Sequence, residues 1–206
     1  MYASPETAVL LVNLGTPDSP TPLAIRHFLS AFLWDKRVVL FPRWLWWCVL
    51  HGLILPFRVF SLAKAYRAIW LEEGSPLRVY TQKLADALNK QLSCYGEHIS
   101  VFAAMTYGEP HLSEIIKSNL CNGVKKLIVL PLFPQSSGTT TLPVFDRVSE
   151  ILCQQPQIPS LTFIHAYGQE VAHIEGLAAH IESFWTTQGS RNHLIFSFHG
   201  IPVRHE

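Results

Sequence analysis

Apolar residues recur along this chain with two periods, and these predict alternating strands and helices. Short uninterrupted apolar runs are typical of buried parallel strands, and they fall at residues 8–14, 99–104, 124–130, 161–166 and 194–198. Between them, apolar residues spaced three and four apart predict helices, including one from Pro22 to Asp35 and one from Pro76 to Leu92. Thr21 and Ser75 stand where each helix needs an N-terminal cap. The alternation predicts an α/β fold with a parallel sheet.

Two segments interrupt this alternation and divide the chain. Residues 36–74 form an apolar, tryptophan-rich excursion, which we interpret as a lid. Residues 154–159, rich in Gln and Pro, are the best candidate for a linker. We therefore expect a first half at 1–155 and the start of a second half at 156–206, containing one strand–helix–strand unit. Two strands bury too little surface to form a domain, so this second half is expected to be incomplete.

Composition narrows the function classes. Hydrophobic residues make up 49% of the chain and charged residues 15%, which is enough for a large core with apolar surface to spare. A net charge of +1 does not suggest a nucleic-acid-binding protein. The four cysteines are scattered without a C-x-x-C pair, which predicts reduced, mostly buried thiols in a cytoplasmic protein. The N-terminus has no basic segment before its first apolar run, so no signal peptide is predicted.

The uncharged stretch from Trp44 to Phe57 is the most apolar part of the excursion. It is too short to span a bilayer, and it contains Gly52 and Pro56. Its tryptophans, flanked by Arg43 and Arg58, suit a membrane interface or the rim of an apolar pocket. A plain core helix is the competing interpretation.

Three loops are expected at one edge of the sheet, because the carboxyl ends of parallel strands meet there. They are Asn13–Pro17, Leu132–Thr141 and His199–Pro202. His199 ends the apolar run 194–198, so a rigid strand would hold its imidazole at the crevice where ligands collect. Alternatively, it is a structural histidine whose nitrogens bond to neighbouring carbonyls. The first loop has one glycine and no Gly-Lys-Ser/Thr, so it is not a phosphate-binding loop.

Four motifs give the chain a family resemblance. They are LVNLGTP at residues 11–17, EGSPL at 73–77, LPLFPQSSGTTT at 130–141 and FSFHGIP at 196–202. In order and spacing they resemble ferrochelatase, and bacterial ferrochelatases most closely. The resemblance implies a chelatase-like fold of two Rossmann-like parallel-sheet halves around a cleft, the second half incomplete here. It also implies insertion of ferrous iron into protoporphyrin IX to form haem, by a cytoplasmic enzyme with peripheral contact to the inner membrane.

The resemblance also assigns roles to particular residues. His199 would be the active-site histidine, as metal ligand or as acceptor of a pyrrole proton. The porphyrin would be lined by Asn13, Leu14, Gly15, Thr16 and Pro17 and by Ser136, Ser137 and Thr139, while Arg37 and Arg67 would pair with its propionates. No built-in cofactor is indicated; Fe²⁺ and the porphyrin are substrates. The family's partner glutamate lies further downstream than this chain extends.

Two positions depart from the family pattern, and two other functions stay open. Ser136 stands where the family usually has an aromatic residue, and Thr106 stands where it often has arginine. The alternatives are a non-catalytic porphyrin- or haem-binding module and a related chelatase that inserts another metal into a tetrapyrrole. Metal preference depends on geometry and supply more than on one histidine.

Overall fold

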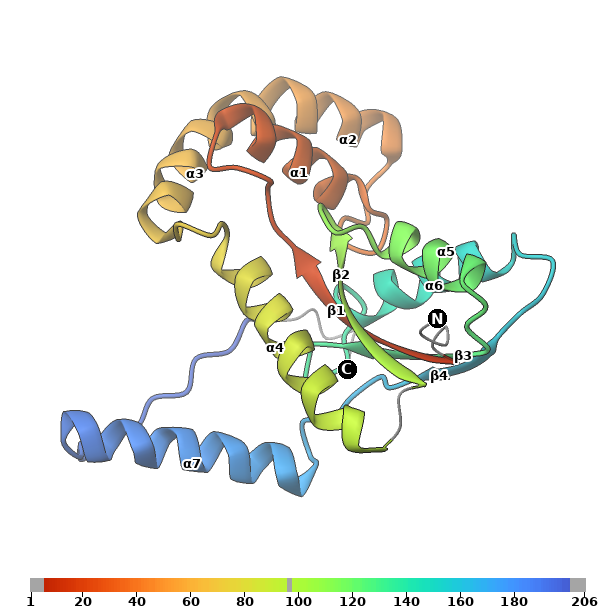
Figure 1. Ribbon diagram of the computed structural model, residues 1–206. Helices are drawn as coiled ribbons and strands as arrows, with labels where there is room; N and C mark the ends of the chain where they lie inside the picture. The colour runs from red at the N-terminus through yellow and green to blue at the C-terminus, as the bar shows by residue number, and fades with distance from the viewer. Residues whose placement is uncertain (1–5, 96–97, 201–206) are drawn as a thin grey trace.

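A computed structural model of the chain describes residues 6–95 and 98–200. Its centre is a four-stranded parallel sheet with the strand order β2-β1-β3-β4 (Figure 1). The strands are β1 (Thr7–Gly15), β2 (Ile99–Tyr107), β3 (Lys126–Pro131) and β4 (Ser160–Phe163). The α/β class and the parallel sheet predicted from the apolar runs are thus confirmed.

Helices connect the strands and add an extension on one side. In chain order they are α1 (Pro22–Trp34), α2 (Arg43–Val49), the π-helix η1 (Leu50–Ile54), α3 (Leu55–Ile69), α4 (Pro76–Leu92), the 3₁₀ turn η2 (Ser93–Tyr95), α5 (Leu112–Cys121), α6 (Thr141–Leu152) and α7 (Val171–Gln188). Thr21 caps α1 as expected, its side chain accepting a hydrogen bond from the Ala24 N–H.

The central strand β1 is buried on both faces, which explains its unbroken apolar run. Leu10 and Val12 pack into one hydrophobic cluster with residues of α5 and α6, whereas Val9 and Leu11 pack on the other face with Ala85 of α4. Successive side chains point to opposite faces of a strand, so an apolar run without alternation suits a sheet covered on both sides. Figure 1 shows α4 on one face and α5 and α6 on the other.

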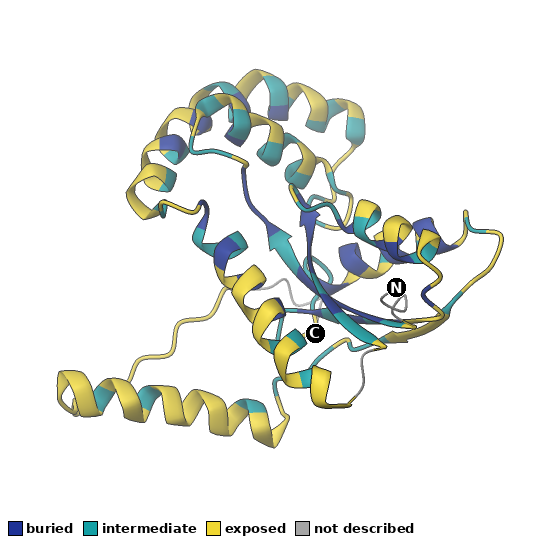
Figure 2. Ribbon diagram, in the orientation of Figure 1, coloured by how far each residue is buried: buried dark blue, intermediate teal, exposed yellow. Residues whose placement is uncertain are grey.

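The helices α1, α2, η1 and α3 form a separate layer, which we call the α1–α3 unit (residues 22–70). Its small core contains Ile25, Val59 and Ala63, and most of its remaining surface is exposed (Figure 2). Residues 43–69 are continuously helical, because the π-turn η1 joins α2 to α3. By length and composition alone this helix could cross a membrane, but the core helix of a soluble protein or a signal sequence can pass the same test.

The strand predicted at 161–166, the first of the expected second half, does not begin a separate sheet. β4 spans 160–163 and pairs in parallel with β3, Leu161 opposite Leu127 and Phe163 opposite Val129. An unpaired strand backbone needs hydrogen-bond partners, and the free edge of β3 supplies them. The division near residue 155 into two halves is not tested by this pairing and stays a prediction.

The expectation of a buried strand at 194–198 is also wrong for this chain. This segment is non-regular and exposed, with Ile195 87% and Phe198 77% accessible. The helix of the expected strand–helix–strand unit, α7, forms, but none of its residues is buried (Figure 2). Apolar periodicity predicts the helix, but the described residues provide no surface that covers it.

The expectation that the cysteine thiols are mostly buried is wrong. Cys48, Cys94, Cys121 and Cys153 are all free and exposed, not mostly buried. All four lie at helix ends or on solvent-facing sides of helices and turns, where cysteine acts as a small surface residue.

Candidate functional site

The carboxyl end of β1 holds the first predicted site segment, and its backbone and side chains are tightly constrained. The Asn13 amide donates to the Thr81 hydroxyl of α4 at 3.1 Å, while its side-chain oxygen accepts from the Leu14 N–H at 2.9 Å. The Thr106 hydroxyl of β2 donates to the Asn13 carbonyl at 3.1 Å. Asn13 therefore ties the ends of β1, β2 and α4 together.

Gly15 and Gly108 allow the backbones at the ends of β1 and β2 to lie in direct contact. Gly15 has φ +115°, and a Cβ there would lie 1.6 Å from the Tyr107 carbonyl oxygen. Gly108 has φ +88°, and a Cβ there would lie 2.5 Å from the Thr16 carbonyl oxygen. Only glycine adopts such backbone angles without strain and leaves room for a facing carbonyl. The glycine of the LVNLGTP motif thus sets the path of the loop.

Thr16 and Ser75 join two of the motifs below this loop. The Thr16 hydroxyl donates to the Ser75 hydroxyl at 2.7 Å, and both residues are almost fully buried. Ser75 precedes α4 as expected, but its hydroxyl makes no cap bond; it accepts the hydrogen bond from Thr16 instead. The LVNLGTP and EGSPL motifs therefore form one buried polar contact.

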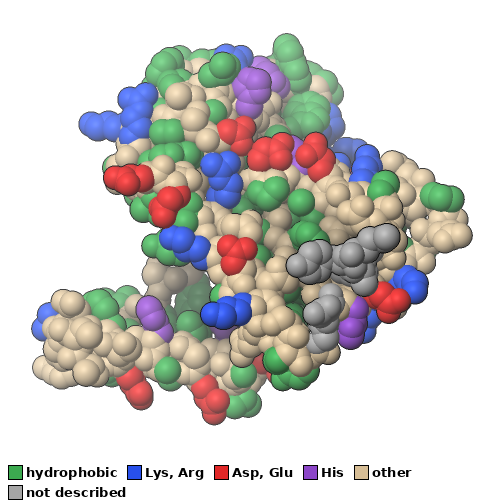
Figure 3. Space-filling view, in the orientation of Figure 1, with side chains coloured by type: hydrophobic (Ala, Val, Ile, Leu, Met, Phe, Trp, Pro, Cys, Tyr) green, Lys and Arg blue, Asp and Glu red, His purple; other side chains and the backbone are tan. Residues whose placement is uncertain are grey.

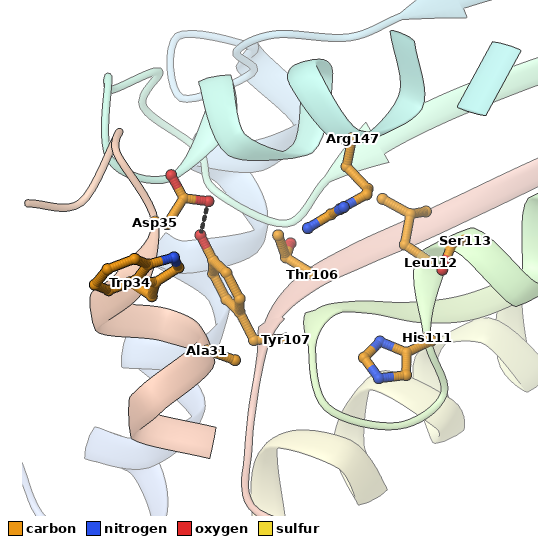
Figure 4. A pocket seen from close by; sticks show the side chains of 9 residues that line it. All are labelled: Ala31, Trp34, Asp35, Thr106, Tyr107, His111, Leu112, Ser113 and Arg147. Atoms are coloured by element: carbon orange, nitrogen blue, oxygen red, sulfur yellow. Dashed lines mark hydrogen bonds between the residues drawn. The ribbon is translucent and has the colours of Figure 1, made fainter. Parts of the chain in front are cut away.

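A cavity of about 390 Å³ lies next to the paired ends of β1 and β2, between α1, the end of β2 and α5 (Figure 4). Tyr107, 4% exposed, donates its hydroxyl hydrogen to Asp35 Oδ2 at 2.7 Å, and its ring packs edge-on against Phe32. Burial and the Asp35 carboxylate raise the pKa of Tyr107 above its usual value, so the phenol stays neutral. His111 and Arg147 line the opposite side (Figure 4).

Arg37 is already paired in this structure. Its guanidinium forms a two-pronged ion pair with Asp146 of α6, Nε to Oδ2 at 2.6 Å and Nη2 to Oδ1 at 3.0 Å. The hydrogen bond and charge of Asp146 raise the pKa of Arg37. A propionate could bind Arg37 only in competition with Asp146.

Arg67 lies on α3 and joins the α1–α3 unit to the loop after β1. Its Nε donates to the Pro20 carbonyl at 3.3 Å. No carboxylate among the described residues pairs with Arg67, so its terminal nitrogens remain available for an anionic ligand.

The loop after β3 is a network of hydroxyl groups. Ser137 Oγ lies 2.7 Å from Thr140 Oγ1 and 3.2 Å from Thr139 Oγ1, and the Ser137 N–H donates to Thr141 Oγ1 at 3.4 Å. These residues precede α6 and satisfy one another rather than an outside ligand. Ser136 is exposed and lines a cavity of about 650 Å³ with the loop 165–170 after β4.

His199 does not lie at a strand end in this structure. It sits in the exposed segment before residue 201, and its Nδ1 lies 2.7 Å from the Gly200 carbonyl oxygen. No described carboxylate contacts it, and no group of three His, Cys, Asp or Glu side chains within residues 6–95 and 98–200 could hold a metal ion. The predicted motif continues through 201–202, which lie outside the described residues.

The structure therefore assembles part of the predicted site and adds residues that sequence reasoning missed. Asn13 to Thr16 lie at the carboxyl edge of the sheet as expected, but the residues that fix them are Ser75, Thr81, Thr106 and Tyr107. Tyr107 could have been found from its position at the end of a predicted strand, directly before Gly108. No local pattern in the sequence marks Asp35 or Asp146 as part of the site, because each bonds to a residue far away along the chain.

The fold and the site define the class of protein. It is a parallel α/β protein in which the ends of β1 and β2 are held in close contact and a helical excursion follows β1. Comparison with known proteins then gives the family. A family model described as ferrochelatase matches residues 6–206, so the chain belongs to the ferrochelatase family.

Individual relatives agree with this assignment. The chain is 49% identical over 197 residues to a ferrochelatase of Photobacterium profundum, and the match covers 96% of this chain and 60% of that protein. It is 48% identical to a ferrochelatase of Vibrio atlanticus, with 99% and 62% covered. For a ferrochelatase of a Janthinobacterium species the identity is 45%, with 98% and 55% covered. The chain thus spans about 60% of the length of these curated relatives.

Proposed function

We propose that this protein inserts ferrous iron into protoporphyrin IX, the last step of haem synthesis. The observation that carries the proposal is the family match over residues 6–206. The constrained segment Asn13–Thr16 supports it, because a flat ligand needs a rigid wall that does not collapse when the cleft is empty.

The reaction requires a base and a metal ligand. Fe²⁺ replaces the two pyrrole N–H hydrogens of the porphyrin, which leave as protons, and the oxidation state of iron does not change. A neutral imidazole can accept such a proton, and it is also a suitable ligand for Fe²⁺. We assign one of these two roles to His199, whose exposure leaves its Nε2 accessible to either substrate.

We further propose that the porphyrin lies along Asn13–Pro17, with Ser136, Ser137 and Thr139 in a second wall. Arg67 is the better of the two candidate partners for a propionate, because its terminal nitrogens have no carboxylate partner among the described residues. Arg37 would first have to leave Asp146, and that exchange would offset part of the binding free energy.

The segment Trp44–Phe57 supports peripheral contact with a membrane. Trp44 is 74% exposed and Phe57 71% exposed, and large exposed apolar patches mark membrane or protein interaction sites. Aromatic residues flanked by arginines suit the interface between headgroups and acyl chains.

A second candidate is a porphyrin- or haem-binding module without insertion. The observation that favours it is the absence of a carboxylate near His199 among the described residues. A related chelatase for another divalent metal is the remaining candidate within the same chemistry, and replacing zinc by cobalt or nickel in the assay below distinguishes it.

Zinc insertion into protoporphyrin, followed by fluorescence, tests the proposal. The native chain is expected to form zinc protoporphyrin, and His199→Ala is expected to lose about 100-fold or more in rate, within the range for removal of a general base. His193→Ala is the matched control, since His193 is equally exposed six residues earlier. Porphyrin binding without insertion would favour the binding module. Equal rates for both variants would remove His199 from the mechanism.

A further inference from the structure

The α1–α3 unit carries a positive charge that the rest of the chain does not share. Residues 22–70 contain one acidic residue, Asp35, against seven basic ones: Arg26, Lys36, Arg37, Arg43, Arg58, Lys64 and Arg67. With histidine neutral, this unit has a formal charge of +6, whereas the whole chain has +1. The remaining residues therefore carry −5, and a charge asymmetry of this size orients a protein toward an anionic surface.

The same unit exposes its large apolar side chains. Trp44, Leu53, Phe57 and Phe60 are each at least 60% exposed, and Trp47 is 54% exposed. Figure 3 shows hydrophobic side chains and a histidine in the upper part of the view, over α1 and α2. Exposed aromatic and leucine side chains of this kind gain free energy from an acyl-chain region, and the net charge of +1 for the whole chain does not suggest a nucleic-acid-binding protein.

A cavity within the unit brings basic groups together. It measures about 460 Å³ and is lined by Arg26, His27, Ser30 and Trp34 of α1 with His51 and Leu55 of the long helix. None of the described residues lining it is acidic. His51 belongs to the π-turn η1, a helix form often found at functional sites, and its ring stacks on Trp47 at 5.0 Å. The basic cavity thus adjoins an exposed tryptophan.

We propose that the α1–α3 unit docks on a bilayer of anionic phospholipids, with a headgroup phosphate seated against Arg26, His27 and His51. This inference rests on the membrane contact proposed above and adds the lipid class and the residues that select it. Arginine and imidazole N–H groups donate to phosphate oxygens, while Trp47 and Trp34 occupy the level of the headgroups. Charge complementarity selects the anionic leaflet, and the exposed apolar residues supply the part of the affinity that does not depend on lipid charge.

Co-sedimentation of the chain with vesicles tests the proposal. We expect binding to phosphatidylglycerol–phosphatidylcholine vesicles to exceed binding to pure phosphatidylcholine vesicles by about 25-fold or more, since two basic residues alone account for a factor of that size. Raising NaCl from 0.1 M to 1 M shortens the screening length from about 10 Å to about 3 Å, so the excess is expected to disappear. Arg26→Gln/Arg58→Gln is expected to weaken anionic binding about 25-fold, at about five-fold for each basic residue.

Two controls identify the surface and the cavity. Lys90→Gln/Lys117→Gln removes the same charge from exposed positions on α4 and α5, and its binding is expected to be unchanged. Lys64→Gln removes one charge from the α1–α3 unit outside the cavity, so Arg26→Gln is expected to weaken binding at least twice as much. Circular dichroism of every variant confirms that it is folded.

The outcomes separate the two proposals. Equal binding to anionic and uncharged vesicles overturns the lipid selectivity and leaves the peripheral contact standing. Failure to bind any vesicle overturns both. Equal losses for the α1–α3 variant and the Lys90/Lys117 control overturn the assignment of the surface, and equal losses for Arg26→Gln and Lys64→Gln overturn the seat in the cavity.

Discussion

Replacing Gly15 by alanine tests the close backbone contact between the ends of β1 and β2, which holds the candidate site in place. Gly15 is paired with Tyr107 across the β1–β2 ladder, and a Cβ on residue 15 would lie 1.6 Å from the Tyr107 carbonyl oxygen. Real Cβ atoms essentially never approach another heavy atom closer than 3.0 Å, so one of the two backbones has to move. Neither can move freely, because Asn13 is bonded to both Thr81 and Thr106.

The expected loss of stability has two parts. A non-glycine residue held at positive φ costs about 1–3 kcal/mol, and overpacking of a constrained site costs about 1–3 kcal/mol more. We therefore expect Gly15→Ala to lower the free energy of unfolding by about 4 kcal/mol, a large fraction of the ~5–15 kcal/mol typical of a folded protein. Displacement of residues 13–17 should also weaken porphyrin binding.

Urea unfolding followed by far-UV circular dichroism measures the effect, and two other glycines serve as controls. Gly123 has φ +84° but open space where a Cβ would lie, so Gly123→Ala should show only the conformational cost of about 1–2 kcal/mol. Gly176 lies within α7 with open space and should tolerate alanine without loss. A Gly15→Ala loss no larger than that of Gly123→Ala would refute the steric argument.

Two further predictions concern pH. Tyr107→Phe should cost about 1.5 kcal/mol at pH 7, because it removes the hydrogen bond to Asp35 from a buried phenol. Since burial and Asp35 raise the pKa of Tyr107 above its usual value of 10.0 in the folded state, its contribution is present below pH 10 and is lost as the pH rises further. The wild-type urea midpoint should thus fall more steeply than that of Tyr107→Phe between about pH 9 and pH 11, and parallel curves would contradict this. The hydrogen bond and charge of Lys125 lower the pKa of Glu6 below its usual value of 4.5. The Glu6–Lys125 pair therefore stabilises the fold above this pH, and its contribution is lost as the pH falls. The urea midpoints of wild type and Glu6→Gln should therefore differ more at about pH 6.5 than at about pH 3.5, and a constant difference would rule out the linkage.

The local pattern of residues was sufficient to predict the structure of those segments whose structure depends on their own residues. The run from residue 8 to 14 predicts β1, since a strand buried on both faces needs unbroken apolar residues. Thr21 and Pro22 predict the start of α1, because the cap and the fixed proline φ act within one turn. The motif at 11–17 also places the candidate site at the right edge of the sheet, because all strands are parallel.

Contacts between distant residues could not be predicted in this way. The propionate role of Arg37 stays a prediction, but its contact with Asp146, 109 residues away, has no local signal in the sequence. Tyr107 and Asp35 likewise meet across 72 residues.

The sequence by itself determined the family and the order of β1 to β4 with the helices between them. Only the tertiary structure decided that β4 joins the first sheet and that 194–198 stays exposed, because strand formation requires a paired edge and burial requires a covering surface. Both depend on which surfaces the other segments leave open.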